Sequence, residues 1–329
     1  FFNSTRGTYG LTVKTTLSSG PFYIYNWTSN GLFLRREPSG TLIDSLRLVQ
    51  NTNNADQPAV ELINSEKCSA AMDDTGSSTS LSSISYSDTT WSLLFNCNTL
   101  FASTPLRQSL AGVAREAAVV PSTGLYAAAS GLVPDGLNVD GMNYRETIGE
   151  ITPAAIDVRA LYLEARQGMA NSDFNKITLM LPAGCGLNEA AETINGAWQK
   201  ELSLFFSIEE VDEETFNKRL ADGDYSIALA PISAEGGSVY NMLAQFTSSG
   251  GGLTGYSNAL YSTQLEASTH ATGTSRCRLL GECERQLLDD CVVVPLFAQQ
   301  KRLLIASGVK DLIFDPFGPV LDLTYTTKE

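Results

Sequence analysis

The sequence predicts an α/β protein in which helices flank a sheet that contains parallel strands. Between residues 177 and 230, helical and strand-like segments alternate with short connections. This alternation is typical of βαβ units, because parallel neighbouring strands need a crossover, which is usually helical. On either side of the helix-rich part of the chain, short strand-like runs and turn residues dominate, so a second unit richer in β-structure is expected.

The N-terminal part of the chain is predicted to form mainly short strands. Residues 22–27 and 32–36 are strand-like runs on either side of Asn30 and Gly31, and Asn-Gly between such runs is a strong hairpin signal. The other elements expected here are strands at residues 45–50, 67–72 and 91–96 and a short helix at residues 59–64.

Two Thr-Pro pairs indicate where helices begin in the middle of the chain, because proline is favoured at the first helical position. Thr104 and Pro105 precede a helix with an apolar face. Thr152 and Pro153 precede a helix that is expected to end near residue 168. The elements expected next are strands at residues 177–181 and 204–208 and a helix at residues 188–202.

The segment from Asp212 to Phe246 contains the predicted ligand site. Asp212 is suited to cap a helix, and residues 225–230 form a short apolar run typical of a buried strand. The loop at residues 231–238 follows the carboxyl end of that strand, which is where ligands bind in open α/β sheets. This loop is therefore the candidate site.

The remaining segments complete a two-unit organisation. Helices are expected at residues 259–268 and 275–289, a strand at residues 291–296, and short strands after residue 301. Residues 100–296 then form one α/β unit, while residues 1–99 and 297–329 together form a β-rich unit. Because ligand sites are common between domains, a cleft between the two units is expected.

Composition and charge exclude several function classes. The chain has 329 residues and a formal net charge of −14, with 43% hydrophobic and 18% charged residues. A protein this acidic is a poor candidate for binding nucleic-acid phosphates. No apolar stretch reaches the roughly 18 residues that indicate a membrane-spanning helix. Because the chain begins at Phe1 without a methionine, it is expected to be a processed or engineered fragment.

The cysteines and the lone histidine, His270, argue against a metal site. Six cysteines show no C-x-x-C spacing, and one histidine is too few for the common structural zinc sites. An even number of cysteines fits either the disulfides of an exported protein or a set of buried thiols. The sequence leaves both possibilities open.

Catalytic motifs are also absent, so an enzyme is not expected. No serine or cysteine lies in a G-x-S-x-G context, and any catalytic triad would have to use His270. There is no Walker A motif and no G-x-G-x-x-G motif after a strand. Adjacent carboxylates such as Asp73 and Asp74 point apart, unlike the facing pair of a glycosidase.

The order of several short motifs resembles that of one protein family. The most specific piece comprises residues 95–96 (FN), 105–111 (PLRQSLA) and 115–116 (RE), which resembles the family pattern FN…PF…VRQAL..A.DRE. The other matching pieces are residues 19–22 (SGPF) with Trp27, 32–36, 43–73, 131–134 (GLVP), 223–225 (GDY), 255–258 (GYSN) and 294–296 (VPL). On these residues the chain is similar to the family 5 extracellular solute-binding proteins, the peptide- and nickel-binding receptors of ABC importers.

The resemblance implies a fold of the periplasmic-binding-protein type II class, with two lobes of mixed or parallel sheets flanked by helices. Residues 1–99 and 297–329 would form part of lobe I, and residues 100–296 would form the second large lobe. Family members are usually longer, so the chain is expected to lack the N-terminal part. The implied function is that of the substrate-binding component of an ABC importer for peptides, without catalysis or a cofactor.

The resemblance also implies partners and a location. The ligand would be a peptide or another small solute, and the protein partners would be the permease subunits of the importer. The chain would act as a monomer outside the cytoplasm, at the cell surface or in the periplasm, held by a lipid on an N-terminus absent from this chain. Two alternatives stay open, an extracellular sensor that uses the same cleft and a binder of a non-peptide solute such as a nickel chelate.

The resemblance places ligand contacts in the loop at residues 231–238. Peptide-binding members have a tryptophan near the end of the preceding strand and an aspartate after it, and here these positions hold Pro231 and Ala234. The neighbouring Glu235 could supply the carboxylate that a peptide's ammonium group needs. Residues 181–188 contain no arginine, which dipeptide-binding members use for the ligand carboxylate, so free dipeptides are not expected. The expected ligand-binding residues are Ser233, Ala234, Glu235, Tyr240, Tyr256 and Asn258.

Four other prominent residues are interpreted as structural or solvated. Trp198 lies on the apolar face of its helix and is expected in the core. Arg107 and Arg115 belong to the most specific motif and are expected to hold the structure together. His270 lies in a Ser/Thr-rich stretch and is interpreted as solvated and not as a nickel ligand.

Overall fold

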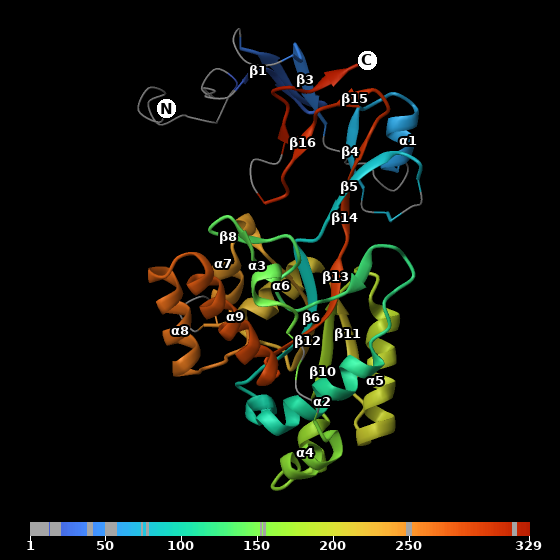
Figure 1. Cartoon of the computed structure of the whole chain (residues 1–329). Helices are drawn as coiled ribbons and strands as arrows, with labels where there is room; N and C mark the ends of the chain where they lie inside the picture. The colour runs from blue at the N-terminus through green and yellow to red at the C-terminus, as the bar shows by residue number, and fades with distance from the viewer. Residues whose placement is uncertain are drawn as a thin grey trace. The chain divides into compact units, whose positions relative to one another are not determined.

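The computed structural model describes residues 13, 21–37, 42–49, 58–73, 75–76, 79–151, 153, 156–247, 252–317 and 321–329. The chain divides into two compact units, one formed by Phe1–Ser85 with Arg302–Glu329 and the other by Tyr86–Lys301 (Figure 1). The second unit contains a six-stranded sheet with helices around it, whereas the first consists mostly of short strands. This organisation confirms the predicted α/β class.

The boundary between the units differs from the one predicted at residues 99 and 297. β6 (Thr89–Phe95) is buried along its whole length. It pairs on one side with β12 (Ile227–Ser233) and on the other with β13 (Val293–Gln299), both in antiparallel orientation. A strand with neighbours on both edges and buried on both faces is central to its sheet. Both β6 and β13 therefore belong to the unit of Tyr86–Lys301, and the chain passes between the units before β6 and after β13.

The six-stranded sheet has the strand order β11-β10-β12-β6-β13-β7. β10 (Thr178–Pro182) pairs in parallel with β11 (Ser207–Val211) and with β12. The helical crossovers of this parallel half are α5 (Asn188–Leu202) and α6 (Glu213–Asp222). The remaining pairings are antiparallel, and β7 (Tyr126–Ala128) forms the far edge. The sheet is mixed, and the predicted βαβ units make up its parallel half.

Side-chain caps fix where two helices begin. Asp212 caps α6 as predicted, because its Oδ1 accepts a hydrogen bond from the Thr215 backbone N–H at 2.9 Å. α2 (Thr104–Ala117) begins at the Thr-Pro pair that predicted its start, and its N-cap is Ser103. The Ser103 hydroxyl accepts the backbone N–H of Leu106 at 3.4 Å.

The helix predicted to begin at Thr152 begins later in the structure. Thr152 itself lies outside the described residues. The helix is α4 (Val158–Ala165), and Asp157 Oδ1 accepts the backbone N–H of Ala160 at 3.0 Å. Aspartate is at least as favourable as threonine at the N-cap position. The helix therefore begins where the Asp157 side chain accepts one of the unpaired backbone N–H groups of the first turn.

The core of the second unit lies between α2, α4, α5 and the sheet, and Trp198 is part of it, as predicted (Figure 1). The Trp198 side chain is fully buried, and its Nε1 donates to the Leu110 carbonyl at 2.9 Å. Its ring packs edge-on against Phe206 with 5.4 Å between centroids. Arg107 and Arg115 donate to backbone carbonyls near the end of the last long helix, which is the structural role expected of them.

Another group of elements in this unit includes those that form the candidate site. The group comprises the hairpin of β8 (Asn138–Val139) and β9 (Met142–Asn143), and the helices α3 (Tyr144–Ile148), α7 (Val239–Ala244), α8 (Ala259–His270) and α9 (Gly273–Asp289). The hairpin and β7 were not predicted from the sequence, because strands of two or three residues give no periodic signal.

A buried carboxylate attaches the segment around α3 to α9. Glu284 on α9 is fully buried and accepts backbone N–H groups of Leu132 at 2.8 Å and Val133 at 3.0 Å. It also accepts the Tyr144 hydroxyl at 2.8 Å and Arg145 Nη2 at 2.8 Å. A buried charge is tolerated only when it is paired and hydrogen-bonded, and here both conditions are met.

The first unit contains four small sheets and one helix among its described residues. One sheet is a meander of β1 (Phe22–Thr28), β2 (Gly31–Arg36) and β3 (Ser45–Leu48), which confirms the predicted hairpin. The other elements are α1 (Ala59–Asn64), the sheet of β4 (Ala70–Asp73), β14 (Lys301–Ile305) and β5 (Ser82–Tyr86), and the pairs β15 (Val309–Lys310) with β18 (Thr327–Lys328) and β16 (Ile313–Phe314) with β17 (Leu321–Asp322). The buried Asp73 pairs with Arg302 Nε at 2.6 Å in this unit.

All six cysteines lie in the described part of the chain and are free thiols. Of the two possibilities that the sequence left open, the structure therefore has thiols. No helix among the described residues is both long enough and apolar enough to cross a membrane.

Candidate functional site

The predicted loop begins where β12 ends, and hydrogen bonds to the start of β6 hold it there. The backbone N–H of Ala234 donates to the Asp88 carbonyl at 2.9 Å. The hydroxyls of Ser233 and Thr89 lie 3.1 Å apart. The loop thus leaves the sheet from a fixed point at the carboxyl end of a central strand, next to the antiparallel strand β6.

Two glycines then turn the chain into α7. Gly236 and Gly237 have φ values of 62° and 68°, a left-handed conformation that glycine adopts without steric cost. Ser238 follows and caps α7, because its Oγ accepts the backbone N–H of Asn241 at 3.1 Å. Glu235 begins the short 3₁₀ turn of Glu235–Gly237, but its side chain lies outside the described part of the structure.

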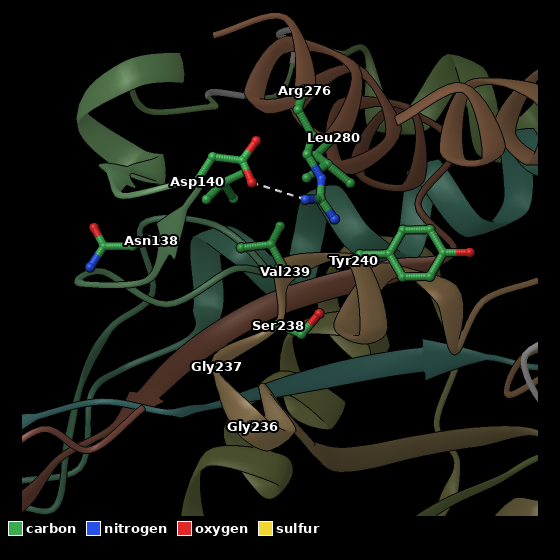
Figure 2. Close-up of a pocket in the computed structure, with 10 residues that line it drawn as sticks. Asn138, Asp140, Gly236, Gly237, Ser238, Val239, Tyr240, Arg276 and Leu280 are labelled. Atoms are coloured by element: carbon green, nitrogen blue, oxygen red, sulfur yellow. Dashed lines mark hydrogen bonds and ion pairs between the residues drawn. The ribbon is translucent and has the colours of Figure 1, made fainter. Parts of the chain in front are cut away.

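A cavity of about 210 Å³ lies beside this turn. Three parts of the second unit form its wall, namely the β8–β9 hairpin, the loop leading into α7, and α9. The lining residues are Asn138, Val139, Asp140, Gly236, Gly237, Ser238, Val239, Tyr240, Arg276 and Leu280 (Figure 2). The wall is mostly polar, and its aliphatic residues are Val139, Val239 and Leu280.

The β8–β9 hairpin brings a carboxylate to the cavity. Asp140 and Gly141 form its two-residue turn with φ values of 52° and 79°. Positive φ at both central positions is the pattern of a type I′ turn, for which Asp-Gly is a preferred sequence. Asp140 Oδ2 accepts the backbone N–H of Gly273 at 2.8 Å, which holds the turn against the start of α9.

Asp140 also forms an ion pair with Arg276 across the cavity wall. Arg276 Nη1 donates to Asp140 Oδ1 at 3.0 Å, and the side chains are 30% and 31% exposed for Asp140 and Arg276, respectively. In Figure 2 the guanidinium reaches from α9 toward Asp140, with the Tyr240 ring on its other side in this view. The pair puts one negative and one positive group on the wall, so the cavity is suited to polar ligand groups.

The structure brings only some of the predicted residues to this cavity. Tyr240 lines it, and Ser233 and Ala234 begin the loop that leads to it. Tyr256 and Asn258 are not among its lining residues. Whether any of these residues contacts a ligand stays a prediction.

Tyr256 and Asn258 form a local network near the end of α9. The Tyr256 hydroxyl donates to Asp290 Oδ2 at 2.5 Å, and Asn258 Nδ2 donates to the Tyr256 oxygen at 3.0 Å. Burial and the hydrogen bond to Asp290 raise the pKa of Tyr256 well above its usual range, so its hydroxyl stays protonated. Asn258 also caps α8 through the backbone N–H groups of Leu260 and Tyr261.

The sequence analysis missed the charged residues of the cavity. Asp140 and Arg276 are 136 positions apart in the chain, so no local pattern joins them. The Asp140-Gly141 dipeptide is a turn signal that could have located the hairpin, but no signal in the sequence points to Arg276.

His270 is exposed, and no group of three or more His, Cys, Asp and Glu side chains in the described residues could hold a metal ion.

Comparisons with known proteins find similarity at the level of structure. No family model matches the sequence, and no curated protein sequence matches it significantly. The pheromone receptor PrgZ, whose structure was solved to show its mode of peptide binding, is 20% identical with a TM-score of 0.67. The match covers 100% of this chain and 68% of PrgZ.

Two further solved structures match over the same extent. The substrate-binding domain of an oligopeptide ABC transporter from Bacillus anthracis is 20% identical, with a TM-score of 0.65 over 99% of this chain and 68% of that one. OppA of Listeria monocytogenes bound to peptide is 18% identical, with a TM-score of 0.66 over 99% of this chain and 68% of that one. The chain therefore has the α/β fold of the periplasmic solute-binding proteins, as its sequence predicted.

Proposed function

We propose that the chain is the substrate-binding component of an ABC importer and that its solute is a peptide. The observation that carries the proposal is the match, along 99–100% of this chain, to three solved structures. They are described as a pheromone receptor with its mode of peptide binding, the substrate-binding domain of an oligopeptide ABC transporter, and OppA bound to peptide. The candidate site adds support from this chain itself, because its loop follows the carboxyl end of β12, where α/β sheets bind ligands.

In this proposal the ligand contacts the loop from Ser233 to Tyr240 and the wall of the adjacent cavity. Ser233, Ala234, Glu235 and Tyr240 supply the loop side of the site, and Tyr256 and Asn258 remain proposed contacts. No cofactor or catalytic step is part of the mechanism, because binding and release are sufficient for a delivery protein.

The cellular setting is also part of the proposal. The chain would belong to the family 5 solute-binding proteins. Its two units would correspond to part of lobe I and to the second large lobe. It would act as a monomer outside the cytoplasm, tethered by an N-terminal lipid, and deliver its ligand to permease subunits. The fold of the matched structures supports this setting.

Thermal melting of the full chain tests the function. A pooled library of short peptides forms one arm, and nickel chelates form a second arm. A ligand present at 100 times its Kd stabilises a protein by about 2.7 kcal/mol, which raises the melting temperature measurably. We expect a rise with peptides that is smaller in Glu235→Ala and unchanged in the control Glu192→Ala, which removes an exposed glutamate from α5. A rise with chelates alone, or with neither arm, would contradict peptide binding.

A second function is favoured by one comparison. PrgZ is described as a pheromone receptor, so a protein of this fold is associated with peptide sensing. We infer that a sensor of extracellular peptides is the main alternative for this chain. Uptake of a bound labelled peptide by the source cells, lost when the gene is deleted, would support import. Binding without uptake would support sensing.

A further inference from the structure

Arg276 uses only part of its guanidinium in the structure. Its Nη1 donates to Asp140 Oδ1 at 3.0 Å. Its Nε is shielded from solvent and has no hydrogen-bond partner among the described residues. An unpaired donor away from water carries a free-energy cost, so such a group in a native structure calls for a physical explanation.

The unused part of the guanidinium has the shape of a carboxylate-binding edge. The N–H bonds of Nε and of Nη2 point in the same direction, and their spacing matches the two oxygens of a carboxylate. Asp140 occupies Nη1 and is itself held by the Gly273 backbone N–H at 2.8 Å. Asp140 therefore orients Arg276 from one side and leaves Nε, which solvent does not reach, without an acceptor among the described residues.

We propose that Arg276 binds a carboxylate of the ligand in this cavity and that Asp140 positions the guanidinium for it. The assignment of that carboxylate to a peptide rests on the proposed function. The cavity volume of about 210 Å³ is below the roughly 300–1,000 Å³ of complete small-molecule sites, so the cavity fits one ligand group and not a whole peptide.

The other walls of the cavity suit this role. A Cβ built on Gly236 meets no heavy atom within 4 Å, so there is open space beside the loop. Val239 and Leu280 contribute apolar surface next to the guanidinium, and a charge-assisted hydrogen bond is stronger where water is displaced.

The first test uses carboxylate binding without any peptide. The full chain is labelled with ¹⁵N-arginine, and the Arg276 Nε–H resonance is assigned by its absence in Arg276→Lys. Sodium propionate is titrated against the isosteric propionamide, with sodium chloride at matched ionic strength. We expect a concentration-dependent shift of the Arg276 resonance with propionate alone. An equal response to all three solutes, or no response to propionate, would overturn the proposal.

Two variants distinguish binding of the ligand carboxylate by Arg276 from a general effect of the positive charge on α9. Arg276→Gln removes the positive charge and the paired N–H donors of the guanidinium, whereas Arg278→Gln removes an exposed arginine from the same helix. A short peptide that stabilises the wild type is compared with its C-terminal amide. We expect the acid to bind about tenfold tighter or more than the amide, because a hydrogen bond to a charged group is lost in the amide. Arg276→Gln should abolish this ratio, and Arg278→Gln should preserve it.

The outcomes keep the two proposals distinct. Peptide acid and amide of equal affinity would overturn the role of Arg276 and leave peptide binding intact. If no peptide binds but Arg276 responds to propionate alone, the proposed peptide function fails, while the carboxylate site stands for another class of ligand. Asp140→Asn provides the positioning test, since it should weaken propionate binding while leaving the Arg276 resonance observable.

Discussion

Lys301 Nζ lies 2.7 Å from Asp88 Oδ1, and this ion pair joins the two segments of the second unit that lie next to its boundary with the first. The same Asp88 accepts the Ala234 backbone N–H through its carbonyl oxygen. One residue therefore contacts both the chain that leaves the unit and the loop of the candidate site.

The Asp88–Lys301 pair is expected to contribute measurable coupling. Their side chains are 25% and 33% exposed, so water screens the pair only in part. Asp88→Asn and Lys301→Met should each lower the free energy of unfolding, with a coupling energy of about 0.5–1 kcal/mol in the double-mutant cycle. Urea unfolding of the four proteins gives this energy. Strictly additive effects would show that the two side chains do not interact in solution.

Removal of the Glu284 carboxylate should lower the free energy of unfolding far more than loss of the Asp88–Lys301 pair. Glu284→Ala leaves two backbone N–H groups and the Tyr144 hydroxyl without their acceptor and removes the carboxylate partner of Arg145, and breaking a buried pair costs about 3–5 kcal/mol. Urea unfolding measures this loss. Hydrogen exchange should also become faster at Leu132 and Val133. A loss below about 1 kcal/mol would mean that water or a neighbour replaces the carboxylate.

The stability of the first unit should depend on pH through Asp73. Burial alone raises the pKa of Asp73, but hydrogen bonds from Thr75 and Arg302 outweigh it and lower the pKa below its usual value. The resulting stabilisation is fully present above the unfolded pKa of about 3.9 and is lost as the pH falls through the lower folded pKa. Unfolding measured between neutral and acidic pH should show this loss, and Asp73→Asn should reduce it. Equal pH profiles for both proteins would contradict this account.

Two glycine substitutions should have opposite effects. Gly236→Ala places a side chain at φ 62° with no neighbour within 4 Å, so only backbone strain of about 1–2 kcal/mol destabilises the loop. Gly196→Ala lies inside α5, also with no neighbour within 4 Å. It should stabilise by about 0.5–1 kcal/mol, because alanine is the better helix former. Thermal melting distinguishes the two, and effects of the same sign would contradict the assigned conformations.

The parts of the fold with local signals were predictable from the sequence. The helix expected at residues 188–202 is α5 with the same bounds, because the period of its apolar face is encoded locally. The strand expected at residues 204–208 is β11, displaced to Ser207–Val211. Leu204 and Phe206 are buried in the core from a connecting segment, so their apolar character reflects tertiary packing and not strand pairing.

The candidate site was predictable only in part. The loop after β12 could be located because a buried strand followed by a glycine-containing loop is a local pattern. The cavity beside it could not, since Asp140 and Arg276 come from a two-residue turn and a distant helix. Their contact depends on how Glu284 fastens the segment around α3 to α9, which is a tertiary interaction without a sequence period.

Hydrogen exchange followed by mass spectrometry, with and without a saturating pool of short peptides, tests the central claim most directly. It reports whether peptides bind and which backbone amides they protect. We predict slower exchange in residues 233–240 and in the β8–β9 hairpin, with no change in α5, which serves as the internal reference. Peptide-dependent protection elsewhere but not at these two segments, or no protection at all, would contradict the proposed site.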